Sequence, residues 1–528
     1  MKPELSSFVG RLSWTPTDKE LKIIQRILSQ CGCGANPLFA KYSFDIICWA
    51  FNTFKLKGLD LKTLIKFQKK IPTVYPWTLL YDTLRQDVNR RFNIFPLMIV
   101  LVRNDAEVAF ALKFAQKYKI HICTRSGAHS YEGYSLCDEM IIDQRERTQV
   151  CLNLSKSLVT IESGVLLGPL INQLFKYKRV LQSGDCSNNG AAGLTLGGGI
   201  GFLTRKYGVT SDSLKELTVV LANGEIVKAN PNCNENLYWA SRGGGGGNFG
   251  IVTSFTFDVH PVDNVVIFEL TYLFEYLKQL LDIYQRWAPF TVDELTAELN
   301  VFSPASPEFS QNLCIKNCFG VPKMEIGGSS ERHFIITGLY LGTQEELVKL
   351  LEPVTSVGTP LIDIRTISYL EAAKVFSGKA HRLPFFKGKS AYFENLMPLE
   401  ALQIIENYML IAPLDSKLEL DAQGGAVNRI AADATAYVHR NTLMWSQFHT
   451  MWIHQNEEPA RLKWITDFYE AMRPYFPEVA YAYVNIVDRE LVDYMNAYYG
   501  FNSQRLIETK QQYDPTNVFH FEQSIPNA

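Results

Sequence analysis

Short apolar runs alternate with segments of helical spacing over about 180 residues in the first half of the chain. Continuous apolar runs of this length predict buried strands, and apolar residues three and four positions apart predict helices. The predicted strands are 96–102, 120–124, 140–143, 158–162, 217–221 and 251–257, and the predicted helices are 105–118 and 167–177. Strands and helices in alternation indicate an α+β domain, which we place at residues 78–263.

The pattern changes after His260-Pro261. Longer runs with alternating apolar and polar positions predict strands at 265–272, 296–301, 333–340, 417–420 and 444–452, with helices at 275–287, 344–351 and 399–410. Alternation of this kind is typical of an antiparallel sheet that is covered on one face. We therefore expect a second α+β domain at residues 264–484, built on a large, mostly antiparallel sheet with helices on one face.

The two ends of the chain differ from both domains. Residues 1–77 are predicted to be mainly helical, with a helix at Leu21–Leu28, and this extension is either a packing element or an oligomer contact. Residues 485–528 carry turn-forming residues at Asp514-Pro515 and Asn517. We expect this C-terminal tail to return and close the first domain.

Composition limits the functional classes. A chain of 528 residues exceeds the size of one simple core, and a net charge of -2 offers no basic field for nucleic acid. The ten cysteines have no paired CxxC spacing and no nearby histidine cluster, so neither a metal site nor a disulfide framework is predicted. The start lacks the apolar core of a signal peptide, and the apolar stretch 44–54 is too short to span a membrane. We expect a reducing, cytoplasmic compartment.

Three glycine-rich loops carry the candidate chemistry. The first, 125–133, contains His129, and the second, 181–214, contains Cys186 followed by seven glycines. The third is Arg242–Gly250, whose flanks resemble core segments rather than a flexible linker. Glycine lets the backbone approach a flat or charged ligand closely, because no Cβ stands in the way. We therefore predict that the three loops wrap one flavin.

Four motifs, in order, resemble the berberine-bridge-enzyme-like family of FAD-linked oxidases. They are RSGAHSYEG at 125–133, GDCSNNGAAGLTLGGGIG at 184–201, RGGGGGNFGIV at 242–252 and YYGFNSQRLIETKQQYDPTNVFHFEQSIP at 498–526. The resemblance extends from about residue 78 to the C-terminus. It implies a PCMH-type FAD-binding domain, made of the N-terminal part and the tail, with an inserted substrate domain.

The resemblance also implies a bicovalent FAD, with His129 on the 8α-methyl group and the Cys186 sulfur at C6. A single histidine or cysteine is more often a structural residue, but the family register of both favours attachment. The implied cofactor-binding residues are His129, Cys186, Arg125, Ser126, Gly127, Ala128, Ser130, Gly190, Gly193, Leu196, Gly197, Gly198, Gly199, Gly201, Gly247, Asn248, Gly250, Ile251, Asn517 and Phe519. Within this set, 125–130 and 197–201 are expected to bind the pyrophosphate through backbone N–H groups.

Substrate oxidation needs a base that takes a proton as the hydride leaves. The family often uses the tyrosine of a Tyr-x-Asn motif, which matches Tyr483 and Asn485 here, and Tyr131 is a weaker candidate. A tyrosine base needs a lowered pKa, hence a nearby cation or hydrogen-bond donor. The alternative is a strand tyrosine with its ring in the core. His439 and Arg440 are interpreted as structural.

The chain departs from the family pattern in three places. Ala128 stands where the family has glycine, and alanine costs about 1 kcal/mol if this position requires φ > 0. Residues 187–189 replace Pro-Thr-Val, so that Asn189 occupies the position that controls oxygen access. Ile486 replaces the usual tyrosine after Tyr-x-Asn.

The sequence thus predicts an FAD-dependent oxidoreductase with a small-molecule substrate, no nucleic-acid partner and no membrane span. It would oxidise an alcohol, sugar hemiacetal or secondary metabolite by hydride transfer to flavin N5, with O2 as acceptor giving H2O2. The alternatives are a dehydrogenase of the same fold and a non-catalytic flavin- or ligand-binding protein. A nicotinamide-binding Rossmann protein is disfavoured, because no G-x-G-x-x-G opens a helix directly after a strand.

Overall fold

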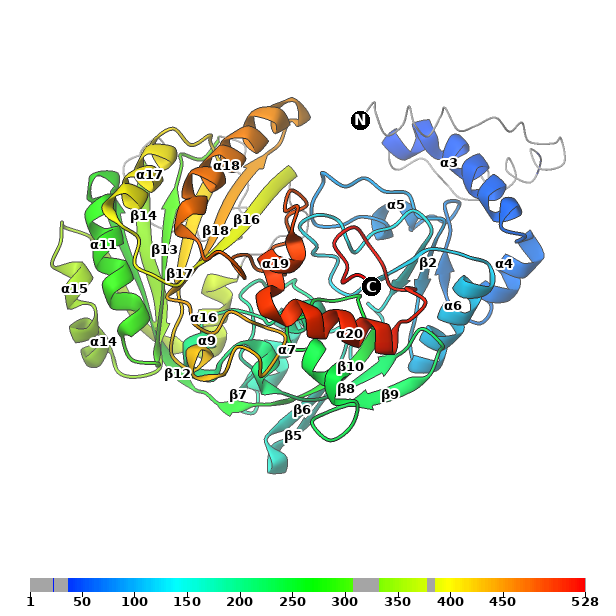
Figure 1. Cartoon of the computed structure of the whole chain (residues 1–528), viewed down its shortest axis with the longest axis horizontal. Helices are drawn as coiled ribbons and strands as arrows, with labels where there is room; N and C mark the ends of the chain where they lie inside the picture. The colour runs from blue at the N-terminus through cyan, green and yellow to red at the C-terminus, as the bar shows by residue number, and fades with distance from the viewer. Residues whose placement is uncertain (1–21, 23–36, 307–331, 378–384, 528) are drawn as a thin grey trace.

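A computed structural model describes residues 22, 37–306, 332–377 and 385–527. Its lobes lie side by side, one built on a seven-stranded sheet and the other on two smaller sheets (Figure 1). Apart from residue 22, the helix expected at Leu21–Leu28 falls outside the described residues. Among the helices that are described, none is long and apolar enough to cross a membrane. No disulfide bond forms among the described cysteines, which are Cys48, Cys123, Cys137, Cys151, Cys186 and Cys233.

The first sheet has the strand order β1-β2-β4-β3, from Thr73–Val74, Met98–Leu101, Met140–Asp143 and Ile122–Arg125. Strand β4 pairs in parallel with β2 and with β3, as expected for strands joined by a crossover helix. That helix, α6 (Asp105–Lys117), begins where the Asn104 side chain accepts a hydrogen bond from the Glu107 N–H. Because β1 pairs with β2, part of the N-terminal extension belongs to this sheet.

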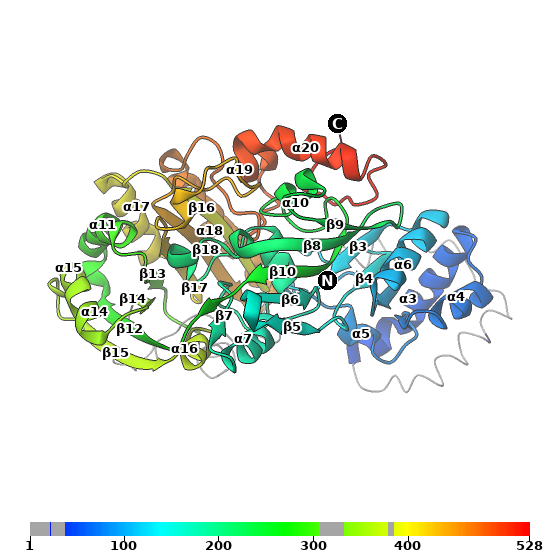
Figure 2. The same cartoon turned by 90° about the horizontal axis from the view of Figure 1, so that it is seen from below.

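The rest of that extension packs on the same sheet. It contributes α3 (Pro37–Leu56) and α4 (Leu61–Gln68), while α5 (Tyr81–Leu84) lies after β1 and beyond the extension. Phe54 and Phe67 are buried in one core with residues of β2 and α6. The described part of the extension is therefore a packing element of the first lobe (Figure 2).

The second sheet is antiparallel, with the order β5-β6-β10-β8-β9. Its strands are Val150–Asn153, Leu158–Glu162, Ile251–Asp258, Leu214–Val220 and Ile226–Ala229. Helices α7 (Leu167–Phe175), α8 (Ala191–Leu196), α9 (Thr204–Tyr207) and α10 (Glu235–Ala240) are interspersed with them. A two-stranded ribbon of β7 (Arg179–Val180) and β11 (His260–Pro261) lies at the passage to the other lobe.

The third sheet has seven antiparallel strands in the order β15-β12-β14-β13-β17-β18-β16. They are Leu361–Ser368, Asn264–Leu273, His333–Tyr340, Leu295–Phe302, Ser416–Ala422, Met444–Trp452 and Phe385–Phe393. Helices α11 (Leu277–Trp287), α17 (Leu399–Leu410) and α18 (Glu458–Met472) cover one face, together with α14 (Gln344–Leu350) and α15 (Glu352–Thr355) (Figure 1). Helix α16 (Tyr369–Phe376) packs against the other face, at the end formed by β12 and β14. The large antiparallel sheet predicted from the alternation is confirmed.

This sheet has two chemically different faces. Along β13, Leu295, Leu299 and Val301 are buried in the core under the helices. Glu298 and Asn300 alternate with them, so their side chains leave the opposite face. That opposite face borders the cavity described below, which gives the sheet an apolar structural side and a polar side.

The C-terminal tail returns to the first lobe through α19 (Tyr494–Tyr499) and α20 (Ser503–Tyr513) (Figure 1). The Lys510 ammonium of α20 binds the Asp514 carboxylate at 2.7 Å and donates to the backbone oxygens of Asn248 and Phe519. Asp514 in turn accepts the N–H groups of Val518 and Phe519. This buried arrangement attaches the tail to the third glycine loop, and the two-part FAD domain predicted from the resemblance is confirmed.

Candidate active site

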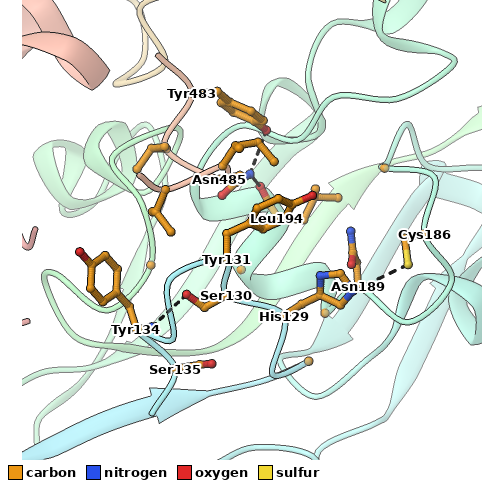
Figure 3. Close-up of a pocket in the computed structure, with 18 of the residues that line it drawn as sticks. His129, Ser130, Tyr131, Tyr134, Ser135, Cys186, Asn189, Leu194, Tyr483 and Asn485 are labelled. Carbon is orange, nitrogen blue, oxygen red and sulfur yellow. Dashed lines mark hydrogen bonds between the residues drawn. The ribbon is translucent and has the colours of Figure 1, made fainter. Parts of the chain in front are cut away.

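The His129 loop and the Cys186 loop meet backbone to backbone at two glycines. A Cβ on Gly190 would lie 2.5 Å from the Ser126 hydroxyl and 2.6 Å from the Gly127 nitrogen, and a Cβ on Gly127 would collide with Gly190. Only glycine permits this approach. As a result, the Cys186 sulfur lies 3.8 Å from Nε2 of His129, although 57 residues separate them in sequence (Figure 3).

These loops form one wall of a cavity of about 910 Å³. The third glycine loop and the tail complete that wall, and the polar face of the seven-stranded sheet lies opposite. The volume is at the upper end of the range for pockets that bury most of a ligand. One continuous cavity therefore connects the three loops with the sheet.

Most of the residues predicted from sequence line this cavity. They are Arg125, Ser126, Gly127, Ala128, His129, Ser130, Tyr131, Cys186, Gly190, Gly193, Leu196, Gly247, Asn248, Gly250, Tyr483, Asn485 and Phe519. Six do not line it, namely Gly197, Gly198, Gly199, Gly201, Ile251 and Asn517.

The four glycines of that second group make room for protein. A Cβ on Gly197 would collide with the Asn485 amide, and a Cβ on Gly198 would lie 2.6 Å from the ring of Tyr437. Gly199 and Gly201 are likewise packed, against Thr210 and the Ser183 carbonyl. The pyrophosphate role expected for 197–201 is therefore corrected: these glycines let side chains from other segments pack against the loop. Ile251 is buried in β10, and Asn517 forms a turn with φ of 51°.

The loops fit an extended ligand with polar groups. A Cβ on Gly193 would meet nothing within 4 Å, and one on Gly247 would meet atoms only at 3.7 Å or beyond, so both glycines leave cavity space open. Among the lining residues, Thr124, Gln144 and Asn189 each carry a buried oxygen without a hydrogen-bond partner, namely Oγ1, Oε1 and Oδ1. Glycines that leave room and acceptors that need donors suit the polar ends of FAD.

Both candidate attachment residues are uncharged. Burial lowers the pKa of His129 to about 4, and burial raises the pKa of the Cys186 thiol. A neutral imidazole has a free lone pair for bond formation, whereas the thiol must lose its proton first. Nε2 of His129 is the nearby group that can accept that proton.

The guanidinium of Arg125 binds protein groups, whereas the sequence predicted that it would bind the cofactor. Its Nε donates to the Asp143 carboxylate at 2.8 Å and its Nη2 donates to the Leu84 carbonyl. Burial opposes the charge of Asp143, but Arg125 and Arg145 outweigh burial and hold the pKa of Asp143 below its usual value. The guanidinium thus fixes the end of β3, where the His129 loop begins.

Tyr483 is held by two donors. The Gly199 N–H donates to its hydroxyl at 2.9 Å, and the Asn485 amide donates at 2.8 Å while also bonding the Leu194 carbonyl (Figure 3). The expected hydrogen-bond donors are present. The expected lowered pKa is not, because burial outweighs both donors and raises the pKa of Tyr483 to about 12.

Tyr131 lies on the other side of the same space. Its hydroxyl accepts a hydrogen bond of 2.9 Å from the Gln447 amide of β18. Its ring fills the place that a side chain at Gly388 of β16 would occupy. Burial raises its pKa. The His129 loop and the seven-stranded sheet therefore contact each other through the Tyr131 ring.

Sequence reasoning missed a row of polar residues on the sheet. Lys417, Glu419 and Asp421 alternate along β17 with core leucines and line the cavity, and Lys417 is ion-paired with Glu419. Glu298 and Asn300 of β13 lie opposite Asp421 and Glu419. The signal was the strict alternation Lys-Leu-Glu-Leu-Asp, which puts three charges on one face of a central strand.

Buried charges join three distant segments around the site. Lys387 of β16 binds Glu132 at 2.6 Å and Asp488 at 2.5 Å, and Lys389 binds the same Asp488 at 2.7 Å. Glu132 follows Tyr131 in the His129 loop, and Asp488 follows Tyr483 and Asn485 in the tail. We call Glu132, Lys387, Lys389 and Asp488 the buried ion network. It holds the sheet, the His129 loop and the tail in register.

His439 and Arg440 have packing roles, as the sequence indicated. The His439 ring stacks on Tyr392 with centroids 3.8 Å apart. Arg440 forms a bidentate pair with Asp212, with both hydrogen bonds at 2.7 Å.

Comparison with known proteins agrees with this architecture. A model of an FAD binding domain matches residues 96–230, and a berberine and berberine-like model matches residues 482–526. The chain is 33% identical to the uncharacterized FAD-linked oxidoreductase YgaK of Bacillus subtilis, over 84% of this chain and 94% of that protein. It is 27% identical to monolignol oxidoreductase AtBBE-like 13 of Arabidopsis thaliana, over 80% and 82% of the two chains.

The fold is similar to that of solved relatives. The structure of wild-type BBE-like 1 from Physcomitrella patens superimposes with a TM-score of 0.78 at 28% identity, covering 88% of this chain and 99% of that one. Fold and site together define an FAD-linked oxidoreductase. The chain belongs to the berberine-bridge-enzyme-like family of these enzymes.

The backbone at Ala128 generates a stability prediction. Ala128 has a φ of 53°, the left-handed region in which alanine is strained. Ala128→Gly should stabilise the protein by about 1 kcal/mol in urea unfolding at constant FAD content. The control is Ala460→Gly in helix α18, which should destabilise by up to about 1 kcal/mol. Destabilisation by both substitutions would contradict strain at Ala128.

Proposed function

We propose that this protein is an FAD-dependent oxidase that oxidises a hydroxyl group of an alcohol, sugar hemiacetal or secondary metabolite. The observation that carries the proposal is the single cavity that joins the His129–Cys186 pair to the polar face of the sheet. Amide and carboxylate side chains on that face suit a substrate with hydroxyl groups. The similarity to a monolignol oxidoreductase supports an alcohol substrate.

We propose that FAD is attached at two points, through His129 and Cys186. The 3.8 Å between Sγ and Nε2 supports this, because both atoms face one narrow region of the cavity wall. Bound FAD supplies the hydride acceptor, and the chain binds and orients it. The open glycines Gly193 and Gly247 would lie along it.

Tyr483 is our proposed base. The Gly199 N–H and the Asn485 amide both point at the oxygen where negative charge develops when the phenol loses its proton. Donors fixed in place before the reaction stabilise such a charge without reorganisation. Because the pKa of Tyr483 is about 12, the fraction of phenolate, and with it the rate, should rise as the pH rises above neutral.

Glu419 is a second candidate for the same role. Its carboxylate is paired with Lys417, and this pairing outweighs burial and raises the pKa of the Lys417 ammonium. A carboxylate on the cavity wall faces the space that a substrate would occupy and can act as a general base. Position and charge therefore favour Glu419, whereas the two preset donors favour Tyr483.

We propose O2 as the electron acceptor. The substrate loses a hydride and a proton, and O2 receives the two electrons and two protons as H2O2. A dehydrogenase that uses another acceptor is the alternative, since the polar Asn189 lines the cavity at the position expected to control oxygen access.

Covalent attachment is tested by acid precipitation of the purified holoenzyme. The pellet should stay yellow, and His129→Ala or Cys186→Ala alone should each leave one bond, visible as an altered spectrum of the pellet. The double variant should release all flavin to the supernatant. Cys151→Ala, at an exposed cysteine, is the control and should behave as the unmodified protein. A colourless pellet from the unmodified protein would refute covalent attachment.

The base is identified by anaerobic stopped-flow measurement of flavin reduction. Tyr483→Phe should slow reduction by about 10²- to 10⁴-fold, whereas Glu419→Gln should change it less. Tyr272→Phe is the matched control, because that buried hydroxyl bonds the Val354 carbonyl inside the sheet core. If Glu419→Gln carries the loss and Tyr483→Phe does not, the base is Glu419.

The acceptor is tested by mixing substrate-reduced enzyme with aerated buffer. Oxidase function predicts rapid return of the flavin absorbance with one H2O2 formed per flavin. Slow reoxidation in air, together with fast reoxidation by an artificial quinone, would show a dehydrogenase.

A further inference from the structure

Two acidic residues face each other across neighbouring strands at the sheet end of the cavity. Glu298 of β13 is paired in register with Asp421 of β17, and the two residues are 9% and 6% exposed. Oxygens of Glu298, Glu419 and Asp421 all lie within 4.8 Å of one another. Like charges directly opposite each other destabilise a sheet, so this arrangement costs stability.

Nearby cations do not balance the acids. The titratable side chains around the pair are Asp185, Lys417, Glu419 and His449. The Lys417 ammonium is already bound to Glu419. Burial lowers the pKa of His449 to about 3, so its ring adds no positive charge. Three carboxyl groups, those of Asp185, Glu298 and Asp421, therefore remain in excess of the cations.

Unsatisfied acceptors give an independent indication of a ligand. Oδ1 of Asn300 and Oδ1 of Asp421 are buried without a hydrogen-bond partner, on residues that are 5% and 6% exposed and line the cavity. The Asn300 side chain is hydrogen-bonded to Glu298, which assigns its NH2 group to that carboxylate and leaves the oxygen free. Both orphan atoms accept hydrogen bonds, so the missing partner is a donor.

The surroundings of the pair also act on its pKa values. Burial first, and then the neighbouring carboxylates, raise the pKa of Glu298 and the pKa of Asp421 well above the usual range. Without a cation the pair must hold a proton. Side chains that oppose folding in this way are characteristic of binding sites rather than of structural sheets.

We propose that Glu298, Asp421 and Asn300 bind a protonated amine of the substrate, so that this enzyme oxidises an amino alcohol or amino sugar. An ammonium group has three donors and no acceptor, which matches two carboxylates and one amide oxygen. This inference rests on the proposed function, because it concerns the substrate of that same cavity. A divalent metal ion is the competing occupant, but the neighbouring Lys417 ammonium would repel a doubly charged ion about twice as strongly.

Charge-matched probes test the proposal on the holoenzyme. One set is glucosamine, glucose and glucuronate, and the other is 4-(aminomethyl)benzyl alcohol, 4-methylbenzyl alcohol and 4-(hydroxymethyl)benzoate, at a pH where the amines are protonated. Apparent Kd is measured from the change in the flavin visible spectrum. In at least one set the cation should bind about ten- to a hundredfold more tightly than the neutral compound. Equal affinities, or no binding by any cation, would overturn the proposal.

The double variant Glu298→Gln/Asp421→Asn tests whether these two carboxylates cause the preference for the cationic probe. It should abolish the preference for the cation, because neutral amides replace both carboxylates. Glu294→Gln, at a half-exposed carboxylate paired with Lys206, is the control and should keep the preference. A preference that persists in the double variant would also overturn the assignment.

Two further readouts separate the remaining outcomes. Calorimetric titration with CaCl2, MgCl2 or ZnCl2 alone should show no stoichiometric binding, and binding lost in the double variant would replace the amine by a metal ion. If a neutral probe reduces the flavin anaerobically and the cationic and neutral probes bind with equal affinity, this inference is wrong while the oxidase function still holds.

Discussion

The structure depends on the contact between Gly127 and Gly190. Two loops more than sixty residues apart in sequence touch through backbone atoms, and no side chain larger than hydrogen fits between them. This contact sets the separation of His129 and Cys186 and fixes the cavity wall against which FAD would lie. The ion pair of Arg125 with Asp143 fixes the start of the His129 loop, which explains why the charged Arg125 is buried there. The chemistry of the site follows from close backbone packing.

The opposite wall follows from strand alternation. In strand β17 the leucines point into the core under the helices and the charged residues point into the cavity. One segment therefore both stabilises the fold and provides polar groups for the site. The chain keeps costly groups there, including the facing pair Glu298 and Asp421. A sheet selected only for stability would not retain them. The second domain is therefore as much a part of the active site as the flavin loops are.

Sequence patterns predicted the regular elements well where the apolar rhythm is strong. Strands β4, β6, β14 and β18 and helix α17 have the expected bounds. Strands β15 and β16 were missed, since exposed positions in the first and a Lys-Gly-Lys segment in the second break the alternation. Motif spacing located His129 and Cys186 in their loops, but it could not show that glycines 197–201 face Asn485 and Tyr437 instead of the cavity. Such assignments depend on which segments pack together, and a linear pattern carries no such information.

The buried ion network has a consequence for biosynthesis. Its charges come from the His129 loop, from β16 and from the tail, and Lys387 is separated from Glu132 by 255 residues and from Asp488 by 101. A ribosome releases these segments at different times, and Asp488, which pairs with both lysines, emerges last. The network therefore cannot be completed until the tail has been synthesised. A chain truncated before Asp488 would retain the three glycine loops yet lack the ion pairs that attach the tail to the sheet.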